Sequence, residues 1–197
     1  MPPTVYVIRH GQGEHNVNEV HHLRDPLLTE TGKAQCKKLQ EGHLTCDLGY
    51  EATITKSEAP NLIAQAAPLY DLKNLDMTLV DETWNSKKGI YAPTLKAVRE
   101  RAATMRNWIY NRPEKHIALV THGAFLHYFT EDWTAYEKSR GTVYLNCEYR
   151  KLEFTEDSNG HEPHLRECGS MLEKQDRPIG LDAHVIHEIE EVERASM

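Results

Sequence analysis

The sequence has few cysteines and no long apolar run, and both shortages exclude classes of protein. None of its four cysteines belongs to a CxxC pair, so neither a disulfide framework nor a zinc site of that type is expected. No apolar run approaches the roughly 18 residues that a membrane helix needs. Met1 is followed by no basic and apolar signal region. We therefore expect a cytoplasmic protein that has free thiols and no membrane partner.

The sequence also has fewer basic than acidic residues. Lysine and arginine number 23 against 30 acidic residues, which gives a formal net charge of −7. A surface of this sign disfavours binding to the phosphate backbone of nucleic acids, and any positive potential must be local to a pocket. The length of 197 residues, with 39% hydrophobic content, suits one globular domain with a sizeable core.

Two apolar runs each end in a histidine followed by glycine. Residues 4–8 lead into Arg9 and His10, and residues 117–121 lead into His122. Both runs are typical of buried strands, and side chains at the carboxyl ends of neighbouring parallel strands face the crevice where open α/β folds bind ligands. Either histidine alone is an ordinary loop residue. Together they predict two imidazoles beside one guanidinium in an anion site.

The residues that follow the two histidines are also suited to binding an anion. Gly11 lets the backbone approach a bound group closely, and Gln12 and Asn16 belong to the same loop. Gly123 opens a predicted helix whose first N–H groups can point at an anion. Lys56 follows another predicted strand, at 50–55. We count all five among the candidate substrate-binding residues.

These motifs resemble those of the histidine phosphatase superfamily, also called phosphoglycerate mutase-like. The resemblance implies a three-layer α/β/α sandwich with a mostly parallel central sheet and helices on both faces. It covers a domain over residues 1–156 and leaves 157–197 as a polar C-terminal extension. The stretches that carry it are RHGQGEHN at 9–16, RDPLLTETGKAQ at 24–35, LVTHGAFLHYFTEDW at 119–133 and, as in the small fungal-type members, NCEYR at 146–150.

Periodicity and capping residues predict further elements. Thr29 is an expected N-cap for a helix over 30–41 that turns Ala34 and Leu39 inward. An apolar stripe predicts a long helix over 95–110, while strands are expected at 75–80 and, at an edge, over 142–150. A last helix carries Val185, Ile186, Ile189 and Val192 on one face. It packs either on the domain or on a second copy of the chain, which would make a homodimer.

The resemblance also implies an activity. It is that of a metal-independent phosphomonoester hydrolase without a cofactor, acting on a small phosphorylated metabolite. His10 would form a phosphohistidine, and Arg9, His122 and Asn16 would hold the phosphate oxygens. No metal ligand is assigned, because neither His21-His22 nor the His161, His164 and Cys168 group has recognised ligand spacing.

A carboxyl group must protonate the leaving oxygen. In the family this is a glutamate just beyond a strand, for which Glu82 fits best and Asp81 is the alternative. Bisphosphoglycerate-dependent mutases of the family carry a larger insertion after it. The short connection over 83–93 therefore favours a hydrolase.

One departure from the family bears on the activity. Leu62 stands where most members have a second arginine that clamps phosphate. Losing such a donor costs about a hundred- to a thousandfold in rate, unless another cation replaces it. Two alternatives therefore stay open: acid-base chemistry (dehydration, isomerisation or hydrolysis) on a non-phosphorylated metabolite, and a catalytically weak binding module. The candidate replacement cations are Lys56, Lys87, Lys88, Arg24 and Arg150.

Overall fold

The computed structural model describes residues 1–17, 27–41, 73, 76, 78, 86–133, 144–168 and 183–196. The chain forms two compact units. The first joins Met1–His10 to Ser86–Met197, and the second is Gly11–Asn85. The sequence-based division at residue 156 stays a prediction.

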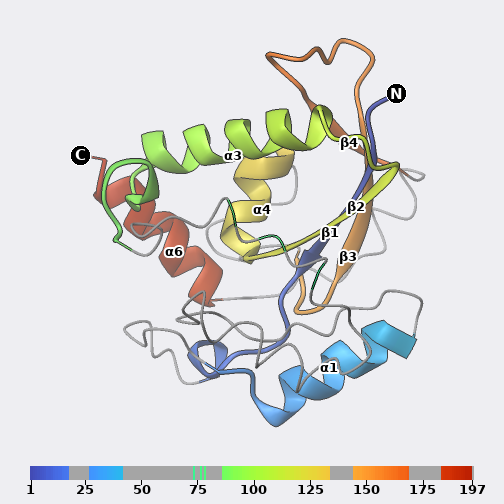
Figure 1. The fold of residues 1–197 in the computed structure, drawn as a ribbon. Helices are drawn as coiled ribbons and strands as arrows, with labels where there is room; N and C mark the ends of the chain where they lie inside the picture. Colours follow the sequence, from blue (N-terminus) through green and yellow to red (C-terminus); the bar gives the residue numbers. More distant parts are fainter. Residues whose placement is uncertain are drawn as a thin grey trace. The chain divides into compact units, whose positions relative to one another are not determined.

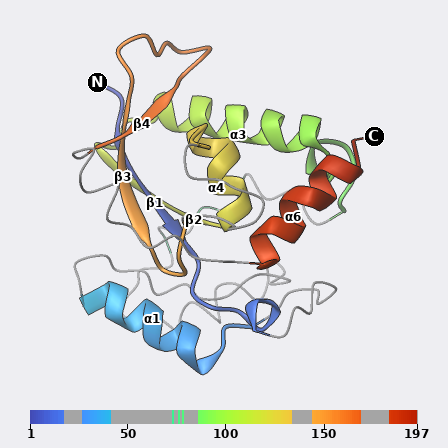
Figure 2. The same ribbon diagram turned by 180° about the vertical axis from the view of Figure 1, so that it is seen from behind.

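A mixed sheet forms the centre of the first unit (Figures 1 and 2). Its described strands lie in the order β2-β1-β3-β4, with β1 parallel to β2 and antiparallel to β3, and β3 antiparallel to β4. The α/β class is confirmed. The strand predicted at 50–55 and most of that at 75–80 lie outside the described residues, so the parallel share of the whole sheet stays a prediction. The strands are β1 Thr4–Arg9, β2 His116–Thr121, β3 Tyr149–Phe154 and β4 Leu165–Glu167.

The main core lies between this sheet and two of its helices, α3 (Leu95–Tyr110) and α4 (Gly123–Thr130). The predicted stripe of α3 is confirmed, since Val98, Ala102 and Ile109 are buried. Thr94 caps this helix by accepting a hydrogen bond from Ala97 N at 3.3 Å. The core residues are Val5, Val7, Ile109, Leu126, Phe129, Tyr144, Leu152, Phe154 and Leu165.

The apolar stripe of α6 (Ala183–Arg194) packs on its own chain. Val185 and Ile189 join Ala124 of α4 in one cluster, and Val192 joins Val98 of α3 in another. The first of the two predicted alternatives is therefore confirmed, while a homodimer stays a prediction. Within the described ranges, no helix has the length and apolar character of a membrane span.

Two strand predictions need correction. The strand expected over 142–150 begins at Tyr149 and lies between β1 and β4 instead of at an edge. Residues 145–148 instead form a turn, in which Cys147 has a φ of 58°. Strand β2, predicted as a buried strand, exposes alternate residues such as Val120, while Ile117 and Leu119 on its other face pack on the core.

The second unit contains α1 (Glu30–Glu41). The predicted cap is present, since Thr29 Oγ1 accepts a hydrogen bond from Gly32 N at 3.0 Å. The predicted inward face is wrong in part: Ala34 is exposed and Leu39 is half-buried. A single small residue gave too weak a signal to set the orientation of the helix.

His127 is a titratable group inside the core of the first unit. Its side chain is 1% exposed, its Nδ1 lies 2.9 Å from Asp132 O, and its ring stacks on Trp133 with centroids 5.0 Å apart. The edge contact with Tyr144 has a centroid distance of 5.2 Å. Burial lowers the pKa of His127, although the hydrogen bond to Asp132 opposes this, and nearby Arg150 lowers it further.

We expect acid to destabilise this unit through His127. Because the pKa is lowered in the folded state, the unfolded chain takes up the proton first, and stability falls as the pH drops below the ordinary histidine value of about 6.5. His127→Asn keeps a donor for Asp132 O but does not titrate. Its free energy of unfolding in urea should be lower at about pH 7.5 yet fall less steeply toward about pH 5. An equally steep fall in the variant would contradict this role.

Candidate active site

Strands β1 and β2 bring two histidines to one edge of the sheet. Their parallel register pairs Arg9 with Thr121, so His10 and His122 follow at neighbouring strand ends. The ring centroids of the two histidines lie 4.9 Å apart, with the planes inclined at 63°. The predicted convergence of the imidazoles is confirmed, and their chemical roles stay predictions.

Hydrogen bonds from both sides fix the backbone at the end of β1. His10 N donates to Thr121 O at 3.0 Å on the β2 side. On the other side, Cys147 N donates to Arg9 O at 3.0 Å, and Asn146 Nδ2 donates to His10 O at 3.0 Å. The backbone that carries His10 is therefore held from both neighbouring segments.

The Arg9 side chain is buried next to Gly123, the first residue of α4. It is 1% exposed, and its Nη1 donates to Tyr144 O at 2.7 Å. A Cβ added to Gly123 would lie 3.2 Å from Arg9 Nε and 3.3 Å from its Cδ. The role of Arg9 in anion binding stays a prediction.

Tyr144 supports Arg9 from inside the core. Its hydroxyl lies 3.1 Å from Thr130 Oγ1, and burial raises the pKa of Tyr144 to about 12, so the phenol stays neutral. The guanidinium carbon of Arg150 sits 3.8 Å from the centre of the Tyr144 ring. Arg150 also pairs with Glu148 at 2.8 Å and with Glu167 at 3.8 Å. With its side chain 3% exposed, Arg150 serves the core, so the structure argues against it as a replacement cation.

Helix α4 begins directly after His122, which is its N-cap residue and makes no side-chain capping bond. Leu126 N donates to His122 O at 3.0 Å. The helix start thus lies against the histidine pair. Its packing depends on Gly123, because an added Cβ would lie only 2.9 Å from Val185 Cγ2 of α6.

We expect Gly123→Ala to destabilise the first unit by about 1–3 kcal/mol, since overpacked side chains force shifts of this cost. Val185→Ala removes one of the two clashes. The double variant should therefore lose less free energy of unfolding than the sum of the single variants, as measured by urea denaturation. Strictly additive losses would contradict the contact between Gly123 and Val185.

The predicted loop residues of the second unit are engaged within that unit. A Cβ on Gly11 would meet Gly32 O at 2.8 Å and Cys36 Sγ at 2.9 Å, so close packing on α1 is one reason for glycine here. Gln12 Oε1 accepts from Thr29 Oγ1 at 2.9 Å, and Asn16 Oδ1 accepts from Gly13 N at 2.8 Å. The substrate-binding roles of Gly11, Gln12 and Asn16 stay predictions.

Several predicted site residues lie outside the described part of the chain. They include both candidate acids and Leu62, which stands in place of the family's second arginine. The geometry therefore tests neither the choice of general acid nor the effect of Leu62. Of the candidate replacement cations, Lys87 and Lys88 are described and exposed. The residues outside the described ranges are Arg24, Lys56, Leu62, Asp81 and Glu82.

His164, in the predicted C-terminal extension, belongs to a network with Glu131 and Arg106. His164 Nδ1 lies 2.7 Å from Glu131 Oε2, and Glu131 Oε1 lies 2.9 Å from Arg106 Nη2. Within the described ranges, no three His, Cys, Asp or Glu side chains gather as a metal site.

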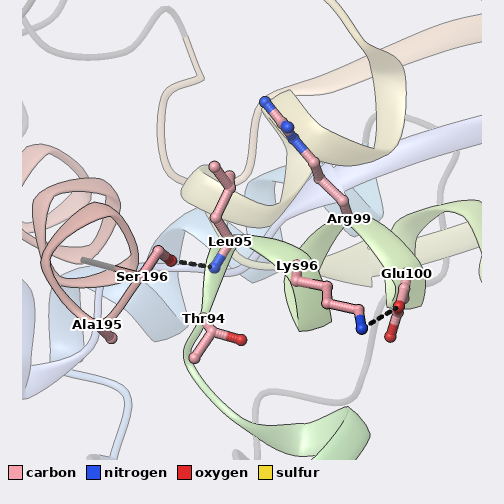
Figure 3. Close-up of a pocket in the computed structure, with 7 residues that line it drawn as sticks. All are labelled: Thr94, Leu95, Lys96, Arg99, Glu100, Ala195 and Ser196. Carbon is pink, nitrogen blue, oxygen red and sulfur yellow. Dashed lines mark hydrogen bonds and ion pairs between the residues drawn. The ribbon is translucent and has the colours of Figure 1, made fainter.

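A hollow of about 500 Å³ lies elsewhere on the first unit, where the start of α3 meets the end of α6 (Figure 3). Ser196 Oγ accepts from Leu95 N at 2.8 Å across it, and Lys96 pairs with Glu100 at 3.9 Å. Ser196 lies just beyond the end of α6, whereas Val185, which lies next to Gly123, is in its first turn. The hollow is therefore separate from the histidine pair. Its lining residues are Thr94, Leu95, Lys96, Arg99, Glu100, Ala195 and Ser196.

The chain is similar to several known proteins. A probable phosphatase of Schizosaccharomyces pombe is 26% identical, with 64% of this chain and 76% of the relative covered. A phosphoserine phosphatase of Entamoeba histolytica, solved with phosphoserine, is 14% identical over 83% of this chain and 94% of its own, with a TM-score of 0.44. A candidate α-ribazole-5′-phosphate phosphatase of Escherichia coli is 16% identical over 90% and 99%, with a TM-score of 0.47.

The family model for the histidine phosphatase superfamily (branch 1) matches residues 70–162. This span contains His122 and the turn that holds the end of β1, while His10 lies before it. Over this span, which includes one of the two histidines in contact, the chain is similar to members of the histidine phosphatase superfamily.

Proposed function

We propose that this protein is a phosphomonoester hydrolase that acts on a small phosphorylated metabolite through a phosphohistidine at His10. The observation that carries the proposal is the 4.9 Å separation of the His10 and His122 rings. Two rings this close, together with the Arg9 guanidinium next to the first residue of α4, are suited to binding a tetrahedral anion. The name of the Schizosaccharomyces pombe relative, a probable phosphatase, supports the same activity class.

In the proposed reaction, a ring nitrogen of His10 attacks phosphorus and the bond from phosphorus to the leaving oxygen breaks. Glu82 donates a proton to that oxygen. A water molecule, deprotonated by Glu82, then attacks the phosphohistidine and releases orthophosphate. His122, Arg9 and Asn16 stabilise the charge on the phosphoryl oxygens, which makes a metal ion unnecessary in this scheme.

An assay with an aryl phosphate tests the proposal. We expect steady release of orthophosphate, competitive inhibition by orthophosphate and vanadate, and no loss of activity with a metal chelator. Turnover of a non-phosphorylated compound without competition by orthophosphate would contradict the proposal.

The leucine at position 62 favours a second candidate, acid-base chemistry on a non-phosphorylated metabolite in the same crevice. Leu62→Arg separates the two candidates. If Lys56 replaces the missing cation, Leu62→Arg should change aryl phosphate hydrolysis little, and Lys56→Met should lower it by about a hundredfold. A many-fold gain in Leu62→Arg would instead favour the second candidate or a binding module with little turnover.

A further inference from the structure

The turn at residues 145–148, together with the preceding Tyr144, forms hydrogen bonds to Arg9 and His10 at the end of β1. Tyr144 O accepts from Arg9 Nη1, Cys147 N donates to Arg9 O, and Asn146 Nδ2 donates to His10 O. Asn146 is the residue of this turn whose side chain forms a described hydrogen bond to the backbone of His10. Its amide is half-buried and 3.0 Å from the carbonyl.

The conformation of the turn is fixed independently of His10. Cys147 has a φ of 58°, a left-handed conformation that is unfavourable for a residue with a side chain. Two bonds hold it: Leu145 N donates to Glu148 Oε2 at 2.7 Å, and Glu148 N donates to Leu145 O at 2.9 Å. Arg150 Nε donates to the other oxygen of the Glu148 carboxylate at 2.8 Å. These bonds therefore hold the turn that carries the Asn146 amide.

The His10 carbonyl depends on this amide. Its other described donor, Cys147 N, lies at 3.3 Å, and the same N–H also donates to Arg9 O at the shorter 3.0 Å. On the opposite side, His10 N is held by Thr121 O. Of the described hydrogen bonds to the His10 carbonyl, the one from Asn146 is therefore the shorter and is not shared.

We propose that Asn146 is a positioning residue that orients the backbone of His10, and through it the imidazole, for in-line attack. This inference rests on the proposed function. Asn146 acts through His10 and not on the substrate, so its effect should fall on the chemical step. Misplacement of a reacting group by about 1 Å costs about a hundredfold in rate, which sets the upper limit of the effect.

Asn146→Ala should lower kcat for an aryl phosphate by about 10- to 100-fold and leave KM within about twofold. Asn146→Asp keeps the size of the side chain but places a carboxylate against a carbonyl, so it should be no better than alanine. Recovery of activity in Asn146→Asp would show that only the volume matters and would overturn the proposal.

Asn107 provides a matched control. Its Nδ2 donates to Gly160 O at 2.7 Å, which is the same type of bond between α3 and a loop. Asn107→Ala should lose stability comparably to Asn146→Ala while its kcat stays unchanged. Equal losses of kcat in the two variants would assign the effect to stability and overturn the proposal.

A rescue experiment tests the route through His10. In His10→Gly, added imidazole can attack phosphorus, displace the aryl oxyanion and form N-phosphoimidazole, which water then hydrolyses. A free imidazole is not attached to the His10 backbone, so adding Asn146→Ala should leave the rescued rate unchanged. A loss equal to that in the chain with His10 would place Asn146 on the substrate and contradict the proposal.

The two proposals fail differently. If the natural chain releases no phosphate from aryl phosphate, the proposed function is wrong and this inference falls with it. If the natural chain is active and Asn146→Ala keeps its full kcat, only the positioning role is wrong.

Discussion

Replacement of His10 with alanine is expected to lower kcat for aryl phosphate hydrolysis by about 10⁴- to 10⁶-fold, the range found when a covalent nucleophile is removed. The reason is that the proposed two-step route has no other acceptor for the phosphoryl group. His122 lies close enough to contact the same anion, but in the proposal it stabilises charge and does not attack. Single-turnover phosphate release, followed with enzyme in excess, measures this loss without interference from product release.

His161→Ala is the matched control, because His161 is exposed and its described hydrogen bond uses only its backbone N–H. Its rate should equal that of the natural chain. Retention of more than about 1% of the activity in His10→Ala would mean that the nucleophile is a different group, since it far exceeds what is left after loss of a nucleophile.

Replacement of Arg9 with lysine is expected to lower kcat/KM by about 10²- to 10³-fold. Lysine keeps the charge but loses the planar fork of donors, of which one Nη reaches Tyr144 O. The loss should appear mainly in kcat, because the charge on the phosphoryl oxygens is best matched in the transition state. Steady-state kinetics and urea denaturation of the same sample give both quantities.

Arg106 offers a control for the structural part of this effect. It is also a buried arginine, and it donates to the carbonyl oxygens of Tyr128, Phe129 and Pro163 at 3.0–3.1 Å. Arg106→Lys should lose stability at least as much as Arg9→Lys and retain its rate. If the two variants lost the same fraction of kcat/KM, Arg9 would be a structural residue and not part of the site.

Local patterns were sufficient to predict most described elements of the first unit. The apolar run before His10 and the one before His122 predicted β1 and β2, and the apolar stripe over 95–110 predicted α3. In each case the signal lies within a few residues, in periodicity or capping. The three-residue β4 was not predicted, because its pairing with β3 is its main determinant and so short a run has no pattern of its own.

The turn before β3 shows why alternation alone misled the strand prediction. Residues 142–150 alternate well, yet Cys147 is left-handed and turns the chain toward β1. Besides its internal hydrogen bonds, the turn is held by contacts to Arg9 and His10, which are 135 and 136 residues away from their partners in the sequence. A local pattern contains no information about such contacts.

The same limit applies to the candidate site. A histidine with glycine at the end of an apolar run is a signal that can be found twice in one sequence, so His10 and His122 could be predicted. Asn146 was noticed only as part of a motif, because an asparagine that donates to a distant carbonyl looks like any other loop asparagine. Gly11 was assigned to ligand approach, whereas its close neighbours Gly32 and Cys36 already exclude a side chain.

The most direct test of the central claim is to trap the phosphoryl group on the protein. The chain is mixed with a phosphorylated substrate, quenched in alkaline denaturant within one turnover, and digested for peptide mass analysis. We predict one phosphate on the peptide that contains His10, stable in base and lost in acid, and none in His10→Ala. Phosphate on a different residue, or full turnover with no phosphorylated protein at any time, would contradict the proposed mechanism.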